Sequence, residues 1–407
     1  MPILVQKFGG TSVADAHRIH LAARRAVRAK LAGNQVVLVL SAMGSATDKL
    51  VALARQVSRR PAKREMDMLL ATGEQVSIAL MAMAIHEAGH EAVSMTGAQA
   101  GLLTDCAHSD ARIQSINTDH IRRVLDDGRI VIVAGFQGVD ADFNITTLGR
   151  GGSDTTAVAL AAALPAELCE IYTDVAGVYT ADPRLVPAAR KLATISYAEM
   201  LELAGLGAGV MHTRAMELGK KYNVPIHVRS SLTDSEGTRI MSNPPGMEDV
   251  VVRAATLKRD IGRVTLIGLP NAPDAVAEIF DEIANRGINV DDIIQTVADR
   301  GRTVTLAFTV ACEDLERTRA VAEQLSDRFR IENIDVADRL AKVSIVGVGM
   351  RSHQGVAARM FRALAGAGIT LRNISTSEIV ISVLVHADDA ENALSAVHEA
   401  FELDRDD

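Results

Sequence analysis

The stretch KFGGTS, close to the first residue of the chain, combines a cation with two glycines and two hydroxyl groups. Glycine allows backbone N–H groups to approach an anion closely, and the hydroxyl groups can donate further hydrogen bonds. We expect the hydroxyl residues also to cap a helix that begins near Val13. The stretch predicts a phosphate-binding turn, although a plain glycine turn with a solvated lysine would have the same sequence. Its residues are Lys7, Gly9, Gly10, Thr11 and Ser12.

A second candidate site lies in TTLGRGGSDTTA, residues 146–157. An arginine beside glycines, just before a helix, suits a carboxylate or a phosphate, because the guanidinium donates two parallel hydrogen bonds and a helix N-terminus attracts anions. An acid is unexpected in such a place. Asp154 therefore either orients a lysine or a metal, or it is an ordinary acid in the first turn of a helix. The other residues of this site are Arg150, Gly151, Gly152 and Ser153.

Two further stretches give weaker signals. In YTDVAGVYTADPR, residues 172–184, acidic and aromatic groups suit a nucleotide base, a ribose and Mg²⁺, but they suit an Asp/Gly/Pro turn equally well. The candidate residues of this loop are Thr173, Asp174, Tyr179, Asp182 and Arg184. The other signal is the pair SAMGSATD and ATGEQVS, which supplies Ser41, Thr47 and Glu74.

The elements that must position these side chains alternate regularly as far as about residue 240. Short runs rich in Val, Ile and Leu are followed by longer segments of helical period. Continuous β-branched runs are typical of strands buried on both faces, so we expect a mostly parallel sheet with helices on both sides. Ligands collect at the carboxyl ends of such strands. The expected strands are residues 35–42, 90–95, 129–136, 169–175 and 224–231.

The remainder of the chain repeats one plan. After SNPPGMEDV, a Pro/Gly-rich linker, residues 263–295 and 342–375 each show a strand, a glycine loop, an amphipathic helix, a glycine turn and a second strand. Each copy continues with another strand and another helix. Two such βαββαβ units of roughly 60–75 residues are ferredoxin-like. The predicted domains are residues 1–245, residues 246–340 including the linker, and residues 341–407.

Composition excludes several classes of protein. The net charge of −8 disfavours nucleic acid as a partner, because phosphate binding needs a clustered basic face. Neither a long apolar run nor a secretory leader is evident, so we expect no membrane association and a cytoplasmic location. The three cysteines and eleven histidines lack metal-type spacing. We therefore expect no protein-bound metal, and we interpret the thiols as small core hydrophobes.

Taken together and in order, these motifs resemble those of the aspartate kinases, a branch of the amino-acid kinase family. The resemblance runs through KFGGTSV, SAMGSATD, GE, AGFQG, TTLGRGGSDTTA, IYTDVAGVYTADPR and VPIHVRSS, and continues into the repeats with GMRSH and ISTSEIVISVLV. It covers essentially the whole chain. It implies an α/β protein in which a three-layer αβα amino-acid kinase domain is followed by two tandem ferredoxin-like ACT domains, as in the monofunctional bacterial enzymes.

The resemblance implies transfer of the γ-phosphoryl group of MgATP to the β-carboxylate of L-aspartate, which begins lysine, threonine and methionine synthesis. Such transfer depends mainly on positioning and on charge neutralisation. By resemblance, Lys7 lies over the transferring group, Asp154 holds Lys7 in place, and the glycines and hydroxyl groups of the first turn surround the phosphates. The loop at 172–184 matches the nucleotide loop of the family. The phosphates themselves can hold most of the Mg²⁺.

For the amino-acid substrate, the resemblance assigns Arg150 to the α-carboxylate and Glu74 to the α-ammonium group. Hydrogen bonds from neighbouring residues complete the implied site. These residues are Ser41, Thr47, Gly151, Gly152 and Ser153.

The regulatory half is similar to ACT domains that bind end-product amino acids at an interface between two such domains. This implies lysine, threonine or both as feedback inhibitors, and an oligomer formed through the ACT domains. Met247 lies where a separately made ACT-only subunit would begin. It could equally well be an ordinary methionine of the linker. The implied effector residues are Asn271, Asp274, Asp291 and Gln295 in the first repeat, and Ile374, Ser375, Thr376 and Glu378 in the second.

Two positions depart from the family pattern. Many relatives carry a lysine in a stretch like G-[AS]-K-[VI]-L, where this chain has Gly209. ATP binding then relies on backbone there, or on a neighbour such as Arg214 or Lys220, and weaker ATP binding is a hypothesis. Relatives often have D-x-P-G where this chain has NAPD at 271–274, which leaves the inhibitor and its affinity open.

Two other functions remain to be weighed. A sister phosphotransferase of the same fold, such as acetylglutamate kinase or uridylate kinase, would lack the SAMG and GE motifs and the ACT repeats. A silent amino-acid sensor would keep the ACT repeats beside an inactive kinase half. Lys7, Arg150 and Asp154 argue against a silent sensor, whereas Gly209 favours it.

Overall fold

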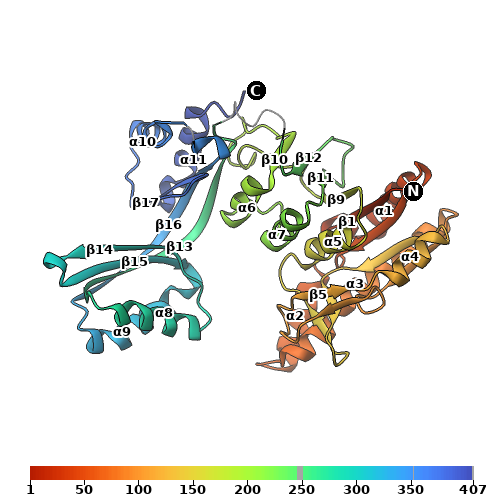
Figure 1. Ribbon diagram of the computed structural model, residues 1–407, viewed down its shortest axis with the longest axis horizontal. Helices are drawn as coiled ribbons and strands as arrows, with labels where there is room; N and C mark the ends of the chain where they lie inside the picture. The colour runs from red at the N-terminus through yellow and green to blue at the C-terminus, as the bar shows by residue number, and fades with distance from the viewer. Residues whose placement is uncertain (245–250, 352, 406–407) are drawn as a thin grey trace. The chain divides into compact units, whose positions relative to one another are not determined.

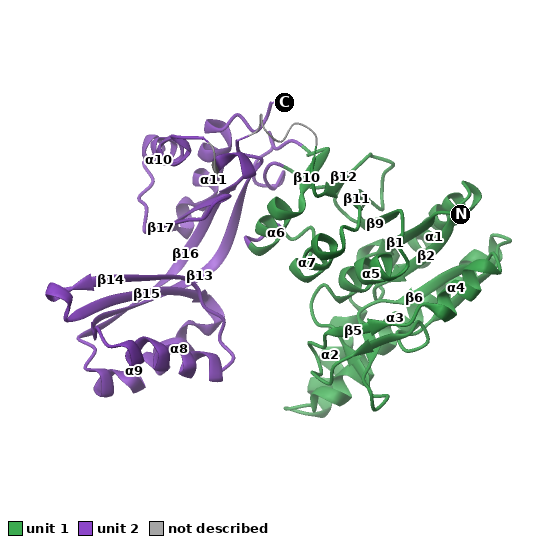
Figure 2. Cartoon of the chain, in the orientation of Figure 1, with its two compact units in different colours: residues 1–179, 191–205, 209–247 green, residues 180–190, 206–208, 248–407 purple. Residues whose placement is uncertain are grey.

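The computed structural model describes residues 1–244, 251–351 and 353–405, and the chain divides into two compact units (Figures 1 and 2). Unit 1 comprises Met1–Tyr179, Lys191–Gly205 and Gly209–Met247, and unit 2 comprises Thr180–Arg190, Leu206–Ala208 and Glu248–Asp407. The linker residues 245–250, and with them Met247, lie outside the described residues. The finer division into three domains stays a prediction.

Unit 1 is built around an eight-stranded sheet. Its strands are β1 Ile3–Phe8, β2 Gln35–Leu40, β3 Ala92–Met95, β6 Ile130–Ala134, β9 Leu168–Thr173, β10 Thr194–Ser196, β11 Ile226–Ser230 and β12 Thr238–Met241. They lie in the order β10-β12-β11-β9-β1-β2-β6-β3, and every neighbouring pair is parallel except β11 with β12. The mostly parallel sheet expected from the Val/Ile/Leu runs is therefore confirmed.

Helices cover both faces of this sheet, which gives the expected three layers. The helices of unit 1 are α1 Ala16–Leu31, α2 Ala46–Val57, α3 Lys63–Glu87, α4 Asp119–Asp126, α5 Gly152–Ala163, α6 Tyr197–Gly205 and α7 Thr213–Tyr222. Helices α1 and α3 bury Ile19 and Ile85 in one core with Phe8 and Leu38 of the sheet. Side chains alternate along a strand, so Lys7 points to the opposite face, which α5 covers.

Unit 1 also contains a smaller four-stranded sheet, in which the strands lie in the spatial order β5-β4-β7-β8. Its strands are β4 Leu102–Thr104, β5 Ile113–Ile116, β7 Gln137–Val139 and β8 Ile145–Thr147. Strand β7 follows β6 directly in the sequence, and β8 leads into the glycines before α5. This small sheet therefore carries the backbone that enters the second candidate site.

Helix α3 is long and apolar enough to cross a membrane by length and composition. Half of its most apolar window is buried, however, and Ile78, Met81 and Ile85 belong to the core beneath α1. The apolar residues of α3 are therefore explained by its place in the core of unit 1.

The first turn differs from the expectation at one point. A short 3-10 helix, η1 Gly10–Val13, follows β1, and α1 begins only at Ala16. The N-cap is Asp15, whose carboxylate accepts a hydrogen bond from Arg18 N at 2.9 Å. The expectation that Thr11 and Ser12 cap this helix was therefore wrong, because the extra turn moves the helix start beyond them.

Unit 2 contains a six-stranded sheet in the order β14-β15-β13-β16-β18-β17. Its strands are β13 Ala254–Pro270, β14 Asp291–Ala298, β15 Thr303–Ala311, β16 Asn333–Val346, β17 Asn373–Thr376 and β18 Val380–His386. Its helices are α8 Pro273–Asn285, α9 Leu315–Phe329, α10 Val356–Gly366 and α11 Ala390–Ala400. One core lies under α8 and α9 and a second under α10 and α11, so the two ferredoxin-like repeats are confirmed.

Strands β13 and β16 are long because each serves both repeats. Residues 261–267 of β13 pair with 333–340 of β16 in the first repeat, and residues 254–258 pair with 342–346 in the second. No strand follows α11 among the described residues. Residues 254–258 therefore supply the fourth strand of the second repeat, so the first repeat is inserted between that strand and the rest of the second.

The cysteines follow the sequence interpretation only in part. Cys169 is buried in β9, whereas Cys106 is exposed and Cys312 half-buried. Core status was therefore predicted correctly for the strand cysteine and wrongly for Cys106, which lies in a loop after β4.

Candidate active site

Backbone hydrogen bonds join the carboxyl ends of three neighbouring strands of unit 1. Gly9 N donates to Tyr172 O at 3.2 Å, which ties the turn after β1 to the end of β9. Ser41 N donates to Phe8 O at 3.1 Å and Gly44 N donates to Gly10 O at 3.0 Å, which tie the same turn to the loop after β2. The first and fourth candidate stretches therefore lie together.

Gly10 is required at its position in this arrangement. A Cβ atom there would lie 2.8 Å from the backbone oxygen of Ala42, which is closer than real Cβ atoms approach. The two loops can approach so closely only because this residue has no side chain. Within the turn, Ser12 is buried and donates to Tyr172 O at 3.5 Å, while Thr11 is exposed.

Lys7 forms an ion pair with Asp154. The Lys7 Nζ atom lies 2.5 Å from Asp154 Oδ1, and the two side chains are only 11% and 13% exposed. The ammonium group also lies 3.5 Å from the place where a Cβ at Gly9 would stand. A positive charge held by an acid of α5 thus faces the bare backbone of the glycine turn.

Glu74 is buried at the same end of the sheet. It is 3% exposed, and its Oε1 atom accepts a hydrogen bond from Ala42 N at 3.1 Å, while Oε2 is buried without a hydrogen-bond partner among the described residues. Burial raises the pKa of Glu74 to about 7, against the opposing effect of two backbone hydrogen bonds. Gly73 allows this close approach, since a Cβ there would lie 2.8 Å from the Ala42 side chain.

Arg150 precedes α5 and is exposed. It forms no hydrogen bond or ion pair with any residue that the structure describes. Gly151 is the N-cap of α5 with φ of 66°, and Ser153 is buried beside Gly135, where a Cβ would lie 2.7 Å from Ser153 Oγ. The guanidinium is therefore available to a ligand, on a turn that is otherwise tightly packed.

The two hydroxyl residues of the fourth stretch lie just after β2 and at the start of α2. Ser41 follows the last residue of β2, and Thr47 lies in the first turn of α2. Both are half-buried. The structure therefore places Ser41 on the loop that contacts the first turn and Glu74, and Thr47 on the helix that follows this loop.

Three residues surround the Arg150 turn that the sequence analysis did not assign to it; His212 and Asp67 were missed, and Arg214 was considered only for ATP binding. His212 packs against Gly151, where a Cβ would lie 2.1 Å from the ring, and its Nδ1 atom is buried without a hydrogen-bond partner in the described part of the chain. Arg214 donates to Leu148 O at 2.5 Å and to Ala111 O at 2.8 Å. The third residue, Asp67, lies on α3 and is buried. Only its spacing, seven residues before Glu74, could have suggested its position.

The predicted nucleotide loop is divided between the two units. In unit 1, Thr173 Oγ1 donates to Asp174 Oδ1 at 3.0 Å, and Tyr179 ends this part of the chain. In unit 2, Asp182 and Arg184 form an ion pair of 2.7 Å, whose hydrogen bonds hold the pKa of Asp182 below its usual value.

The part of this loop that belongs to unit 2 is anchored in the second repeat. Ala181 and Val186 lie in the core with Val397 of α11. Thr180 Oγ1 and His398 Nε2 lie 3.0 Å apart, and both side chains are buried. The segment that follows Tyr179 is therefore a structural part of the regulatory half.

Several of the predicted effector residues lie on the two opposite edge strands of the sheet in unit 2. Asp291 and Gln295 are on edge strand β14, and residues 374–376 are on edge strand β17. Asn271 donates to Gly301 O at 3.0 Å, while Asp274 is exposed in the first turn of α8. Glu378 follows β17 and is exposed. One chain therefore does not bring the two sets together.

Asp291 is already paired within the chain. Lys342, which is 2% exposed, places its Nζ atom 2.8 Å from Asp291 Oδ2 and 2.6 Å from Asp292 Oδ2. An ammonium group therefore lies against the carboxylates of β14. A group that bound these acids would do so beside, or in place of, Lys342.

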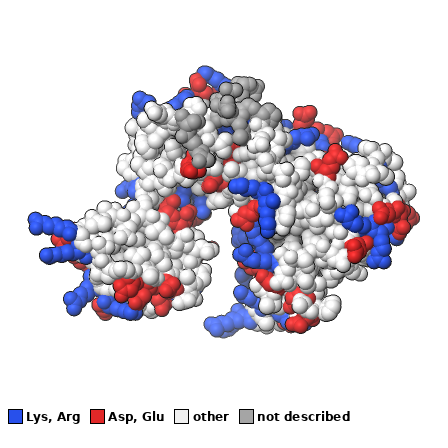
Figure 3. Space-filling model, viewed as in Figure 1, with Lys and Arg blue, Asp and Glu red and all other residues white. Residues whose placement is uncertain are grey.

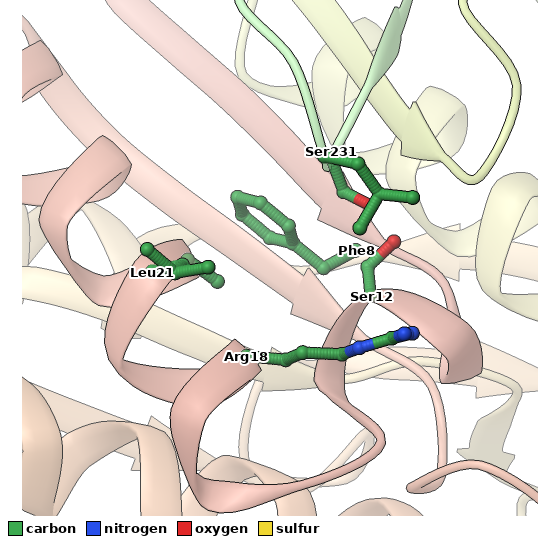
Figure 4. Close-up of a pocket in the computed structure, with 7 residues that line it drawn as sticks. Phe8, Ser12, Arg18, Leu21 and Ser231 are labelled. Carbon is green, nitrogen blue, oxygen red and sulfur yellow. The ribbon is translucent and has the colours of Figure 1, made fainter.

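A small pocket lies on the other side of β1 (Figure 4). Phe8, Ser12 and Arg18 line it, together with Leu21, Ala22, Ser231 and Leu232. Because Phe8 and Lys7 point to opposite faces of the strand, this pocket is separate from the ion pair. No group of three or more His, Cys, Asp or Glu side chains that could hold a metal occurs in the described ranges.

Comparisons with known proteins agree with this arrangement. The model of the Amino acid kinase family matches residues 2–230, and two ACT domain models match residues 263–330 and 343–401. Aspartokinase 2 of Bacillus subtilis is 53% identical over 100% of this chain and 99% of its own. The crystal structure of E. coli aspartokinase III in complex with aspartate and ADP (R-state) is 27% identical, with a TM-score of 0.82 over 98% of this chain and 99% of that one. The complex of that enzyme with lysine and aspartate (T-state) is 27% identical, with a TM-score of 0.78 over the same shares.

Together, the parallel sheet, the glycine turn beside Lys7 and the two repeats define an amino-acid kinase with a regulatory half of ACT domains. Sequence identity of 53% to known aspartokinases, over the whole length of this chain, narrows the class further. The chain belongs to the aspartokinase family, and it is a phosphotransferase that acts on aspartate.

Proposed function

We propose that the enzyme transfers the γ-phosphoryl group of MgATP to the β-carboxylate of L-aspartate. The observation that carries this proposal is the Lys7–Asp154 ion pair beside the glycine turn, with the buried Glu74 carboxylate at the same end of the sheet. A carboxylate oxygen of aspartate attacks the γ-phosphorus, the bond to the bridging oxygen of ADP breaks, and 4-phospho-L-aspartate forms. The attacking carboxylate is already ionised near neutral pH, so no protein base is needed.

In this proposal, charge neutralisation is the main contribution of the protein. Lys7 approaches the transferring phosphoryl group, Asp154 keeps the ammonium in place, and N–H groups of Gly9 and Gly10 approach the phosphates. Thr11 and Ser12 belong to the same turn. Mg²⁺ would bind with the nucleotide and neutralise phosphate charge, and Thr173, Asp174 and Tyr179 bind the nucleotide itself. A nucleotide contact of Asp182 and Arg184 remains a prediction.

The proposed aspartate site uses two charged side chains that differ in burial. Glu74 pairs with the α-ammonium group from its buried position, and the exposed Arg150 binds the α-carboxylate with two parallel hydrogen bonds. Ser41 adds a hydrogen bond from the loop after β2 and Thr47 adds one from the first turn of α2. Gly151, Gly152 and Ser153 add them from the start of α5. Opposite charges at opposite ends of the site orient the substrate.

We propose further that lysine, threonine or both inhibit the enzyme through the ACT repeats. Support comes from the E. coli relative, whose crystal structure contains lysine and aspartate in the T-state. An effector shifts a two-state balance only through its different affinity for the two states. The acids of β14 offer negative charge that suits an amino-acid ammonium group.

The regulatory sheet also supports an oligomer formed through the ACT domains. Both edge strands carry exposed apolar side chains, namely Ile293 and Val297 on β14 and Ile374 on β17, which are 55%, 59% and 43% exposed. Unpaired edges of this kind readily accept another chain. Asp291, Gln295 and residues 374–376 lie on these edges, so a second copy would bring the two predicted sets closer. A separate subunit beginning at Met247 remains a prediction.

The proposed setting is the cytoplasm, at the first step of lysine, threonine and methionine synthesis. Acidic and basic side chains are interspersed over the face drawn in Figure 3, and the net charge is −8. This distribution supports small-molecule substrates rather than nucleic acid.

Aspartate-dependent release of ADP from MgATP tests the function. We expect turnover by the purified chain, and a lower rate when lysine, threonine or the two together are added. Turnover without any effect of either amino acid would refute the proposed regulators and leave the kinase activity in place. No turnover, but thermal stabilisation by lysine or threonine, would favour a silent sensor.

A further inference from the structure

Asp67 is a buried acid that the proposed reaction does not use. Its side chain is 0% exposed, and it lies in the second turn of α3. Ser109 N donates to its two oxygens at 3.0 and 3.1 Å, Thr147 Oγ1 donates to Oδ1 at 2.6 Å, and His108 Nδ1 lies 2.8 Å from Oδ2. A buried carboxylate needs such partners, so these segments are held firmly against α3.

Both segments that Asp67 holds lie against the turn that carries Arg150. Thr147 is the last residue of β8, and Ala111 N donates to its backbone oxygen at 2.9 Å. Ser109 has a left-handed backbone with φ of 73°, and its oxygen would lie 3.1 Å from a Cβ at Gly149. The Asp67 carboxylate therefore holds Thr147, two residues before Gly149 in the chain, and Ser109, which packs against Gly149. Gly149 directly precedes Arg150.

The same helix carries Glu74. Asp67 and Glu74 are seven residues apart, which is about two helical turns, so both point from the same face of α3. One rigid helix thus holds the acid proposed for the substrate ammonium and the acid that fixes the turn of Arg150. The distance between the two proposed substrate contacts depends on this helix.

We propose that Asp67 is a positioning residue for aspartate binding, because it fixes the Arg150 turn relative to Glu74. This inference rests on the substrate roles proposed above for Arg150 and Glu74. It concerns binding of the amino acid and not of the nucleotide, since Asp67 bonds to His108, Ser109 and Thr147 and to none of the residues proposed for the nucleotide.

Asp67→Asn tests the inference, because it keeps the size of the side chain and places an N–H₂ group against donors. We expect the KM for aspartate to rise at least about tenfold, with the KM for ATP within about twofold of its original value. Glu170→Gln is the matched control. Glu170 is also buried, and it accepts hydrogen bonds from Gln6, Tyr172 and Arg229, so its loss perturbs the fold without reaching the Arg150 turn.

A merely structural role would lower the melting temperature or kcat in both variants and leave the aspartate KM unchanged, which would overturn the inference. Thr147→Val is the second test, which can be used if Asp67→Asn does not fold. It removes one hydrogen-bond donor to the Asp67 carboxylate, so we expect it also to raise the aspartate KM. In the double variant the two effects should not multiply, since the Thr147 hydroxyl acts through its hydrogen bond to the carboxylate that Asp67→Asn already removes. Independent, multiplying effects would contradict the inference.

Arg150→Lys separates the inference from the proposed function. A raised aspartate KM in Arg150→Lys with a normal one in Asp67→Asn and Thr147→Val would refute only the role of Asp67. A normal aspartate KM in Arg150→Lys would refute the proposed substrate site, and the inference with it.

Discussion

Lys7 Nζ lies 2.5 Å from Asp154 Oδ1, so an ion pair joins the end of strand β1 to the first turn of helix α5. Both side chains are nearly buried, and neither charge is easily supported alone in such a place. The acid at a helix N-terminus, which is unexpected in an anion site, is explained by the cation that it holds.

Asp154→Asn should therefore lower kcat. Without the negative charge, the Lys7 ammonium loses its fixed position, and we expect kcat to fall by about tenfold to a hundredfold while the aspartate KM changes little. Initial rates of ADP release over a range of aspartate concentrations measure both constants. Lys7→Met sets the scale, because it removes the proposed phosphoryl contact itself. Full kcat in Asp154→Asn would show that Lys7 needs no partner.

Arg150→Lys should change binding and leave stability intact. The exposed guanidinium has no partner among the described residues, so its replacement removes no contact from the fold. Lysine cannot donate two parallel hydrogen bonds to one carboxylate. We expect the aspartate KM to rise at least about tenfold and the melting temperature to stay the same. An aspartate KM close to that of the original enzyme would exclude a carboxylate contact at this position.

The fold could be predicted from the sequence where the signal is local. The β-branched runs gave β2, β6 and β9 because burial on both faces requires such residues, and the two repeats were visible as two copies of one pattern. The pairing of residues 254–258 with residues 342–346 could not be predicted, because nothing local to either segment encodes it. For the same reason, the sequence did not reveal that residues 180–190 pack as part of unit 2.

The site could be predicted only where glycines or charges stand in a motif. Glu74 and Asp67 look alike in the sequence, as acids on an otherwise apolar helix, and a lone acid is usually on the surface. Their burial becomes evident only when α3 is packed against the loops at 42 and 109. His212 gave no signal either, because it contacts Gly151 from the N-cap of α7, about 60 residues further along the chain.

Gly209→Lys should strengthen ATP binding. A Cβ at Gly209 would meet no atom within 4 Å, so a lysine fits there without displacing the fold. Arg214, which was considered as a substitute, already donates to Leu148 O and Ala111 O. We expect the KM for ATP to fall several-fold, by roughly the value of one charged hydrogen bond, with the aspartate KM unchanged. Gly205→Lys is the matched control, because that site is equally open and gains the same charge. An equal effect of both variants, or none, would count against a nucleotide contact at Gly209.

The pKa of Glu74 predicts how aspartate binding depends on pH. Burial raises this pKa to about 7, and the proposed contact with the substrate ammonium needs the ionised form. As the pH falls below about 7, Glu74 becomes protonated, so the aspartate KM should rise by up to about tenfold per pH unit, while the KM for ATP should not follow. Glu74→Gln should have a high aspartate KM without this pH dependence.

The same shift has a consequence for the enzyme without substrate. Between pH 4.5 and about 7 the folded state binds the Glu74 proton more tightly than the unfolded state does, so this residue contributes stability at low pH that is lost as the pH rises through about 7. Urea unfolding of the original enzyme and of Glu74→Gln at pH 6 and pH 8 isolates this contribution. We expect the Gln variant to gain stability relative to the original at pH 8. Equal differences at the two pH values would show that Glu74 titrates as an ordinary exposed carboxylate, and the aspartate KM should then lose its dependence on pH near 7 as well.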